Sequence, residues 1–239
     1  MVVGRGKTPV GRASGKIGRS PVEAFLQKLS VAPVPTHLGR GRLLFALDAT
    51  ASREATWDQA CHIQAEMFGA AAEVGGLEIQ LAYYRGHLDF CATPWLGDAA
   101  ALVREMTVVD CRAGHTQIAR VLDHALAEAR QGRVSAVVFV GDCVEEDAAE
   151  LCRKAGELGV RGTRVFMFQE GDDPAAQVAF QQIATLSGGA WCRFDLGSAG
   201  QLRDLLKAVA VYAAGGKKAL LAHSDRVGGD VLQITRQLG

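Results

Sequence analysis

The sequence contains no long apolar run, no paired cysteine motif and no apolar segment near its amino terminus. Every apolar stretch is shorter than the roughly 18–20 residues that cross a membrane, and the first residues lack the apolar part of a secretory signal. The six cysteines are scattered without a CxxC pair, which argues against structural zinc and a disulfide framework. We therefore expect a cytoplasmic protein with reduced thiols and no membrane association.

A surplus of charge is also absent, because the formal net charge is zero. Residues 1–20 hold Arg5, Lys7, Arg12, Lys16 and Arg19 and no acid, which leaves −5 on the remainder. No basic surplus covers the chain as a whole, so we expect no specific binding to nucleic acid. The 239 residues suffice for one α/β domain that buries roughly 70% of its unfolded surface, with segments to spare.

The composition of the chain and the positions of its prolines and glycines predict four segments. The first is a basic flexible arm, and the second is a short helix that begins at Pro21, followed by a linker with Pro33 and Pro35. An α/β domain and a helical extension, broken at Gly228–Gly229, complete the chain. The expected boundaries are 1–20, 21–41, 42–214 and 215–239.

Hydrophobic periodicity predicts that strands and helices alternate along the α/β domain. Such alternation indicates a doubly wound, mostly parallel sheet with helices on both faces. The strand at 87–92 follows a tight turn at Arg85–Gly86 and is expected to be an antiparallel edge strand. Glu145, Glu146 and Asp147 are expected to begin a helix, where acids favour the helix dipole. Strands are predicted at 43–47, 77–84, 87–92, 134–141, 162–169 and 190–194, and the other helices at 54–74, 98–106, 117–130, 174–186 and 198–213.

The stretch from Leu43 to Ser52 has the most informative pattern. Leu43 to Leu47 is a continuous apolar run, which is typical of a strand covered on both faces. Asp48, Thr50 and Ser52 follow at alternate positions, so their side chains should point the same way from the carboxyl end of the strand. Open α/β sheets bind their ligands at that end. One carboxylate and two hydroxyls suit a hard divalent cation, Mg²⁺ above all.

Two further oxygen-bearing residues occupy comparable places. Thr116 lies in a polar loop before a predicted helix, and Asp142 follows the apolar strand 134–141. With Asp48-x-Thr50-x-Ser52, these residues resemble the metal-ion-dependent adhesion site of von Willebrand factor A domains, which has the pattern D-x-S/T-x-S, a distant Thr and a distant Asp. The resemblance covers about residues 42–213, and the three parts stand in the family's order.

The resemblance implies a Mg²⁺ ion, or in its place Mn²⁺ or Ca²⁺, held by the hydroxyls of Thr50, Ser52 and Thr116. Asp48 and Asp142 would bind it directly or through water. It further implies that a Glu or Asp of another protein completes the metal shell, and that the chain is an adaptor rather than an enzyme. Intracellular members of the family commonly work in assemblies with ATPases or chaperones, so such an assembly is the expected setting.

Each of these residues also has a simpler explanation. Ser52 and Thr116 could cap helices, Asp48 could hold a turn, and Asp142 could end a strand without further role. His115 is expected to hydrogen-bond within its loop, and Cys143 is expected to be an unreactive thiol. If the metal site is vestigial, the domain would be a metal-free scaffold.

A phosphohydrolase of the haloacid-dehalogenase type is the enzymatic alternative, with Asp48 as nucleophile. That chemistry needs a fixed cation, usually Lys, near the transferred phosphoryl group. The chain has no lysine between Lys28 and Lys154, and Thr50 stands where the hydrolytic enzymes have a second acid. These features favour the binding module.

Overall fold

A computed structural model describes residues 40–54, 57–58, 62, 69–71, 76–194 and 199–227. Four predicted segments lie wholly or partly outside the described residues. They are the basic arm, the helix that begins at Pro21, most of the helix at 54–74 and the end of the helical extension. Within this part, no helix is both long and apolar enough to cross a membrane.

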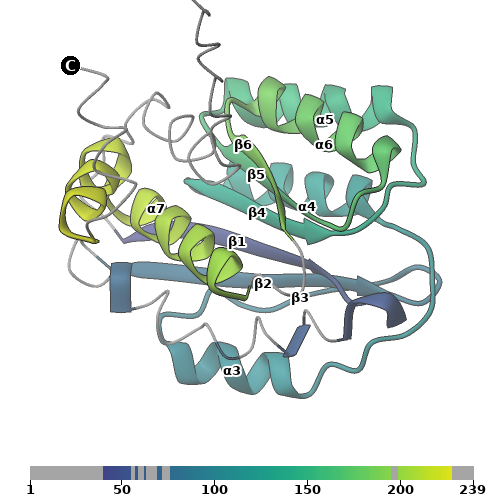
Figure 1. The fold of residues 1–239 in the computed structure, drawn as a ribbon, viewed down its shortest axis with the longest axis horizontal. Coiled ribbons are helices and arrows are strands. Elements are labelled where there is room, and N and C mark those ends of the chain that lie inside the picture. Colours follow the sequence, from purple (N-terminus) through teal and green to yellow (C-terminus); the bar gives the residue numbers. More distant parts are fainter. Residues whose placement is uncertain are drawn as a thin grey trace, which may run out of the picture.

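The described strands form one six-stranded sheet in the order β3-β2-β1-β4-β5-β6 (Figure 1). Only β3 is antiparallel to its neighbour β2, and all other pairs are parallel. This arrangement confirms the predicted doubly wound sheet with an antiparallel edge strand. The strands are β1 Gly41–Asp48, β2 Leu77–Arg85, β3 Asp89–Ala92, β4 Ala136–Gly141, β5 Arg164–Glu170 and β6 Ala190–Phe194.

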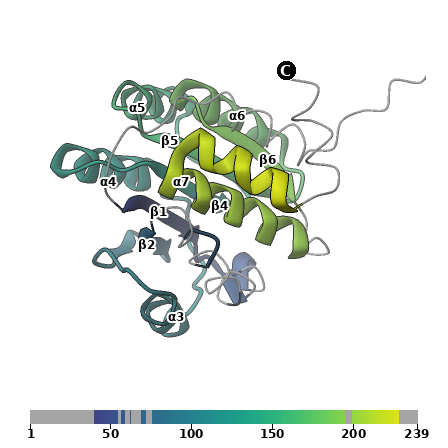
Figure 2. The ribbon, with the colours of Figure 1, turned by 90° about the vertical axis from the view of Figure 1, so that its left-hand side faces the viewer.

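Helices cover both faces of the sheet (Figure 2). Residues of α3 and α7 belong to the core on one face, and residues of α4, α5 and α6 to the core on the other. Strand β1 supplies both cores, because Leu43 and Phe45 face one side and Leu44 and Ala46 the other. The helices are α3 Ala99–Thr107, α4 Ile118–Gln131, α5 Ala148–Val160, α6 Pro174–Ser187 and α7 Ala199–Val227.

The start of α5 differs from the prediction. The helix begins at Ala148, and Asp147 caps it by accepting a 3.0 Å hydrogen bond from Ala149 N. Glu145 and Glu146 therefore precede the helix and lie in the loop after β4. Their carboxylates bind the backbone before and within α4 instead, which outweighs their tendency to begin a helix of their own.

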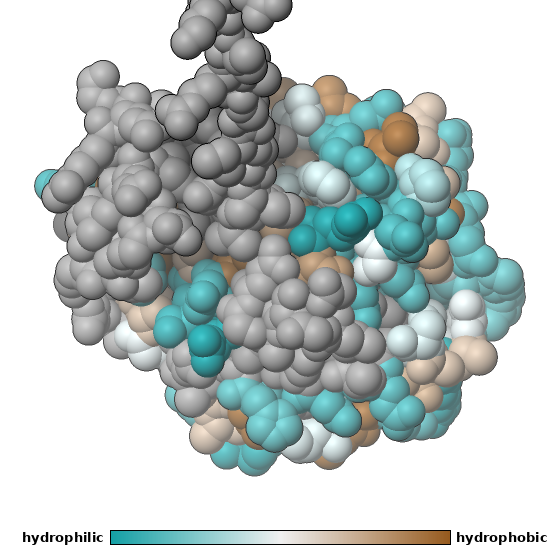
Figure 3. Space-filling view, viewed as in Figure 1, coloured by the Kyte–Doolittle hydropathy of each residue, from teal (hydrophilic) through white to brown (hydrophobic). Residues whose placement is uncertain are grey.

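The last described helix is bent rather than ended by glycine. Gly216 has a φ of +69° inside α7, so two helical pieces meet there. Beyond this bend the chain stays helical to Val227, and Leu220 is buried in the same core as β1. Figure 3 shows mainly hydrophilic residues on the described part of one face of the molecule, with hydrophobic residues scattered among them.

Candidate metal centre

The strand register brings the ends of β1 and β4 together. Leu47 pairs with Val140, so Asp48, the last residue of β1, lies beside the end of β4, and Asp142 follows directly after that end. Both strands end at the same edge of the sheet (Figure 1). This is the edge at which parallel α/β sheets bind their ligands.

Asp48 is the most buried acid of the centre, at 2% exposure. Its Oδ1 accepts a hydrogen bond of 2.8 Å from Thr50 N, and its Oδ2 accepts one of 3.0 Å from the Tyr84 hydroxyl. Burial raises the pKa of Asp48, the hydrogen bonds from Thr50 and Tyr84 oppose that rise, and the nearby charge of Asp142 adds to it. A positive charge placed here would relieve both unfavourable effects.

A chain of oxygens connects Thr50 with Asp142. The Thr50 and Ser52 hydroxyl oxygens lie 3.3 Å apart, and Ser52 donates a 2.9 Å hydrogen bond to Asp142 Oδ2. Thr50 continues the extended chain, as predicted, but Ser52 lies in a short 3₁₀ helix, η1 (Ala51–Arg53). The turn of η1, rather than strand alternation, therefore sets the direction of Ser52.

The other carboxylate oxygen of Asp142 lacks a partner. Asp142 Oδ1 is buried and has no hydrogen-bond partner among the described residues. A buried oxygen without a partner costs free energy, so such an atom calls for a missing donor or cation.

Thr116 is held differently from the other four predicted residues. Its hydroxyl donates to Glu146 Oε2 and accepts a 3.0 Å hydrogen bond from Glu145 N, so its described bonds go to the loop after β4. The loop before Thr116 nevertheless runs beside the end of β1, because Arg112 N donates a 3.0 Å hydrogen bond to Ala49 O. The structure thus joins Asp48, Thr50, Ser52 and Asp142 by interactions and adds Thr116 on a neighbouring loop.

Glu145 and Glu146 are residues of this centre that the sequence did not identify. Glu146 Oε1 accepts hydrogen bonds from Ile118 N and Ala119 N, and Glu145 Oε2 accepts one of 2.8 Å from Thr116 N. Helix α4 has no side-chain cap of its own at Gln117 and no acid in its first turn. Two features of the sequence could have predicted this contact: α4 begins without a capping residue, and two acids follow directly after a neighbouring strand.

The two polar neighbours of the centre behave as expected. His115 Nδ1 lies 3.1 Å from Glu145 Oε2, which makes it a hydrogen-bonding residue of the loop. Burial, and then the charge of Asp142, raises the pKa of Cys143 to about 12. The thiol therefore stays protonated near neutral pH and is a poor nucleophile.

The donor atoms fit a hard cation. Two carboxylates and three hydroxyls provide only oxygen, as Mg²⁺ prefers. In the described ranges, no group of three or more His, Cys, Asp or Glu side chains could hold a metal ion. The two carboxylates of the candidate centre do not make up such a group by themselves, so hydroxyls would have to complete its donor set.

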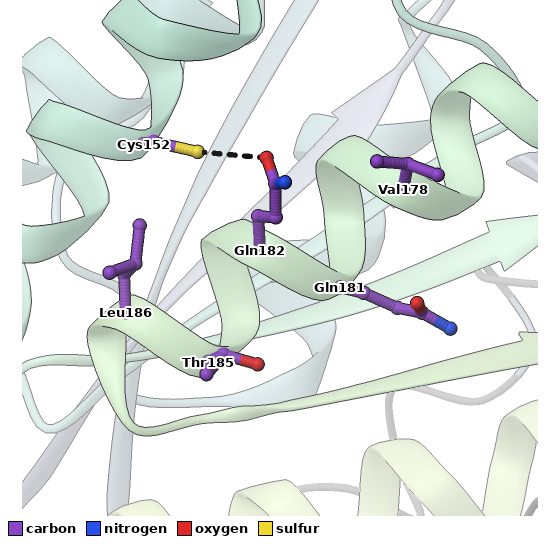
Figure 4. Close-up of a pocket in the computed structure, with 6 residues that line it drawn as sticks. All are labelled: Cys152, Val178, Gln181, Gln182, Thr185 and Leu186. Carbon is purple, nitrogen blue, oxygen red and sulfur yellow. Dashed lines mark hydrogen bonds between the residues drawn. The ribbon is translucent and has the colours of Figure 1, made fainter.

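A separate groove of about 550 Å³ lies between α5 and α6. Figure 4 shows Cys152 pointing toward Gln182, with Val178 and Leu186 along the same groove. The Cys152 thiol lies 3.4 Å from Gln182 Oε1. None of the predicted site residues lines this groove.

No protein-family model and no curated protein sequence matches the chain. Solved structures do resemble it. A von Willebrand factor type A protein from Catenulispora acidiphila has 16% identity and a TM-score of 0.56 over 72% of this chain and 43% of that one. The SpRpn10 VWA domain has 16% identity and a TM-score of 0.53 over 70% and 94%.

A third similar structure contains a metal. Proximal thread matrix protein 1 from the mussel byssus, with a zinc-occupied MIDAS motif, has 15% identity and a TM-score of 0.55. It matches 72% of this chain and 46% of that one. At such identities the likeness concerns the fold, and this chain has the fold of von Willebrand factor A domains.

Proposed function

We propose that this chain is a protein-interaction module that uses a divalent cation, Mg²⁺ first of all, to bind a Glu or Asp of another protein. Asp142 carries the proposal: one oxygen accepts a hydrogen bond from Ser52, and the other is buried and meets no hydrogen-bond partner in the part of the chain that the structure describes, near the buried Asp48. The hydrogen bonds described for these two carboxylates all come from neutral groups. A cation would balance their charge.

The hydroxyls of Thr50, Ser52 and Thr116 would hold the ion, with Asp48 and Asp142 bound directly or through water. Because Mg²⁺ wants about six oxygens and is rarely enclosed by protein alone, an oxygen from outside would complete the shell. When bound, the ion would supply a positive centre for a partner's carboxylate. The zinc-occupied motif of the mussel protein supports a divalent ion at such a place.

The proposed partner is a protein with an accessible acidic residue, in an assembly of the ATPase or chaperone kind within the cytoplasm. Catalysis is not part of the proposal. Asp48 is 2% exposed with both oxygens hydrogen-bonded, which suits a fixed ligand better than an attacking nucleophile. Lys154, the first lysine after Asp48 in the sequence, forms ion pairs with Asp123 and Glu150 on the helical layer.

The test uses immobilised peptides that each carry one Glu or Asp, with matched peptides that carry Gln or Asn. We expect the acidic peptides alone to bind, in Mg²⁺ but not in EDTA. Asp142→Asn should abolish this binding. Asp204→Asn, which removes an exposed acid paired with Arg203 on α7, is the matched control and should bind like the wild type.

Two results would replace the proposal. Binding that persists in EDTA and in Asp142→Asn would indicate the metal-free scaffold. Turnover of a generic phosphate ester that Asp48→Asn abolishes would indicate the phosphohydrolase.

A further inference from the structure

The loop between β4 and α5 contacts the start of α4, and two of its residues form hydrogen bonds with Thr116. The backbone N–H of Glu145 donates a 3.0 Å hydrogen bond to the Thr116 hydroxyl, and the Glu145 carboxylate accepts a 2.8 Å hydrogen bond from Thr116 N. Glu146 accepts a hydrogen bond from the Thr116 hydroxyl with one carboxylate oxygen. Thr116 itself is buried at 7% exposure, while the Glu145 side chain that binds it is 47% exposed.

The Glu146 carboxylate is itself fixed. Its second oxygen accepts hydrogen bonds from Ile118 N and from Ala119 N, the latter at 3.2 Å. The N-terminus of a helix favours an anion at this position. Glu146 therefore cannot swing away from Thr116 without exposing the uncapped end of α4.

Among the residues with described contacts, the hydroxyl of Thr116 uses two of its three hydrogen-bonding sites. A threonine hydroxyl has one proton and two lone pairs. Its O–H donates a hydrogen bond to Glu146 and one lone pair accepts one from Glu145 N, which leaves the second lone pair. A hydroxyl binds a cation through a lone pair, so its O–H has to donate a hydrogen bond in another direction.

We infer that Glu146 is a positioning residue of the proposed metal centre: by accepting the hydrogen bond of the Thr116 hydroxyl, it keeps the remaining oxygen lone pair of Thr116 available to the cation. This inference rests on the proposed function and adds a residue to it. Carboxylates that orient metal ligands in this way typically change metal affinity when they are removed.

The test is a double-mutant cycle on Mg²⁺ affinity, measured by isothermal titration calorimetry. Glu146→Gln should weaken Mg²⁺ binding by about 10- to 100-fold. Thr116→Val should also weaken it, while Thr116→Ser, which keeps the hydroxyl, should bind nearly as the wild type. In the Thr116→Val background, Glu146→Gln should have no further effect, because the hydroxyl through which Glu146 acts is gone.

Glu157→Gln is the matched control, since Glu157 is an exposed acid that pairs with Arg153 on α5. Its Mg²⁺ affinity should equal that of the wild type. Thermal melting in EDTA reports whether each variant folds. If Glu146→Gln does not fold, Glu146→Asp, which keeps an anion near the helix start, takes its place in the cycle.

Two outcomes would overturn the inference while leaving the metal centre intact. An unchanged affinity of folded Glu146→Gln would show that Glu146 plays no part. An equal loss in the wild-type and Thr116→Val backgrounds would show that Glu146 acts on the ion or on α4 independently of Thr116. Failure of the wild type to bind Mg²⁺ would instead defeat the proposed function.

Discussion

In the proposed metal centre, Asp48 has to serve as a ligand although the fold buries it. The hydroxyl of Tyr84 contributes to this, because it donates to Asp48 Oδ2 from a ring that is itself buried and stacked 6.3 Å from Phe139. Each donor lowers the cost of a buried carboxylate. Tyr84, on the neighbouring strand β2, thus stabilises the buried carboxylate of Asp48 through a hydrogen bond.

Tyr84→Phe keeps the ring and removes this donor. We expect the free energy of unfolding in urea to fall by about 1–3 kcal/mol, because a buried acceptor loses its partner. Tyr83→Phe removes a hydroxyl from the adjacent, partly buried residue and should cost less. Equal losses in the two variants would contradict the role given to Tyr84.

His124 should make stability depend on pH. Burial lowers the pKa of His124, an effect that Glu128 partly opposes, and its Nε2 lies 2.9 Å from Gln80 Oε1. Below pH 6.5, which is about the usual pKa of histidine, this side chain therefore takes up a proton more readily in the unfolded chain than in the folded chain. The stability from this residue is present above pH 6.5 and is lost as the pH falls toward the lowered pKa.

His124→Gln should remove that loss. Between pH 7.5 and 5.5, the wild type should lose more free energy of unfolding than the variant, as measured by urea denaturation at each pH. His87→Gln, at an exposed residue of the turn between β2 and β3, should follow the wild type. The idea fails if His124→Gln and the wild type lose stability in parallel.

Among the elements, α5 and α6 pack closely through one glycine. A Cβ on Gly159 would lie 2.6 Å from Leu186 O, while a Cβ on Gly156 would meet nothing within 4 Å. The two positions, both on α5, therefore separate packing from helix propensity.

Gly159→Ala should destabilise the protein by about 1–3 kcal/mol, because the added carbon has to push the backbone of α6 away. Gly156→Ala should stabilise it by about 0.5–1 kcal/mol, because alanine favours the helix interior and has room there. Thermal or urea unfolding of both variants checks the pair. Changes of the same sign would contradict the described contact.

At this scale, the sequence allowed the elements to be predicted better than the contacts between them. The apolar runs from Leu43 and Val134 revealed buried strands, since burial on both faces leaves no polar alternation. The predicted start of α5 was wrong because Glu145 and Glu146 accept hydrogen bonds from backbone N–H groups at the start of α4, which lie 27 to 29 residues earlier in the chain. Local propensity cannot report such a partner.

For the whole molecule, the order of the motifs along the chain was informative because the sheet is parallel. The ends of parallel strands meet at one edge, so Asp48 and Asp142 could be expected together, and Ser52 indeed bonds to Asp142. The sequence could not predict that Thr116 is held by Glu145 and Glu146. That arrangement depends on the path of two loops, which no periodicity encodes.

The most direct test of the central claim is the location of the ion. Crystals grown in Mn²⁺, which substitutes for Mg²⁺ and scatters anomalously, would reveal it. We expect one anomalous peak bound by the hydroxyls of Thr50, Ser52 and Thr116, beside Asp48 and Asp142, and no such peak in Asp142→Asn. Wild-type crystals in Mn²⁺ with no peak between these residues would contradict it.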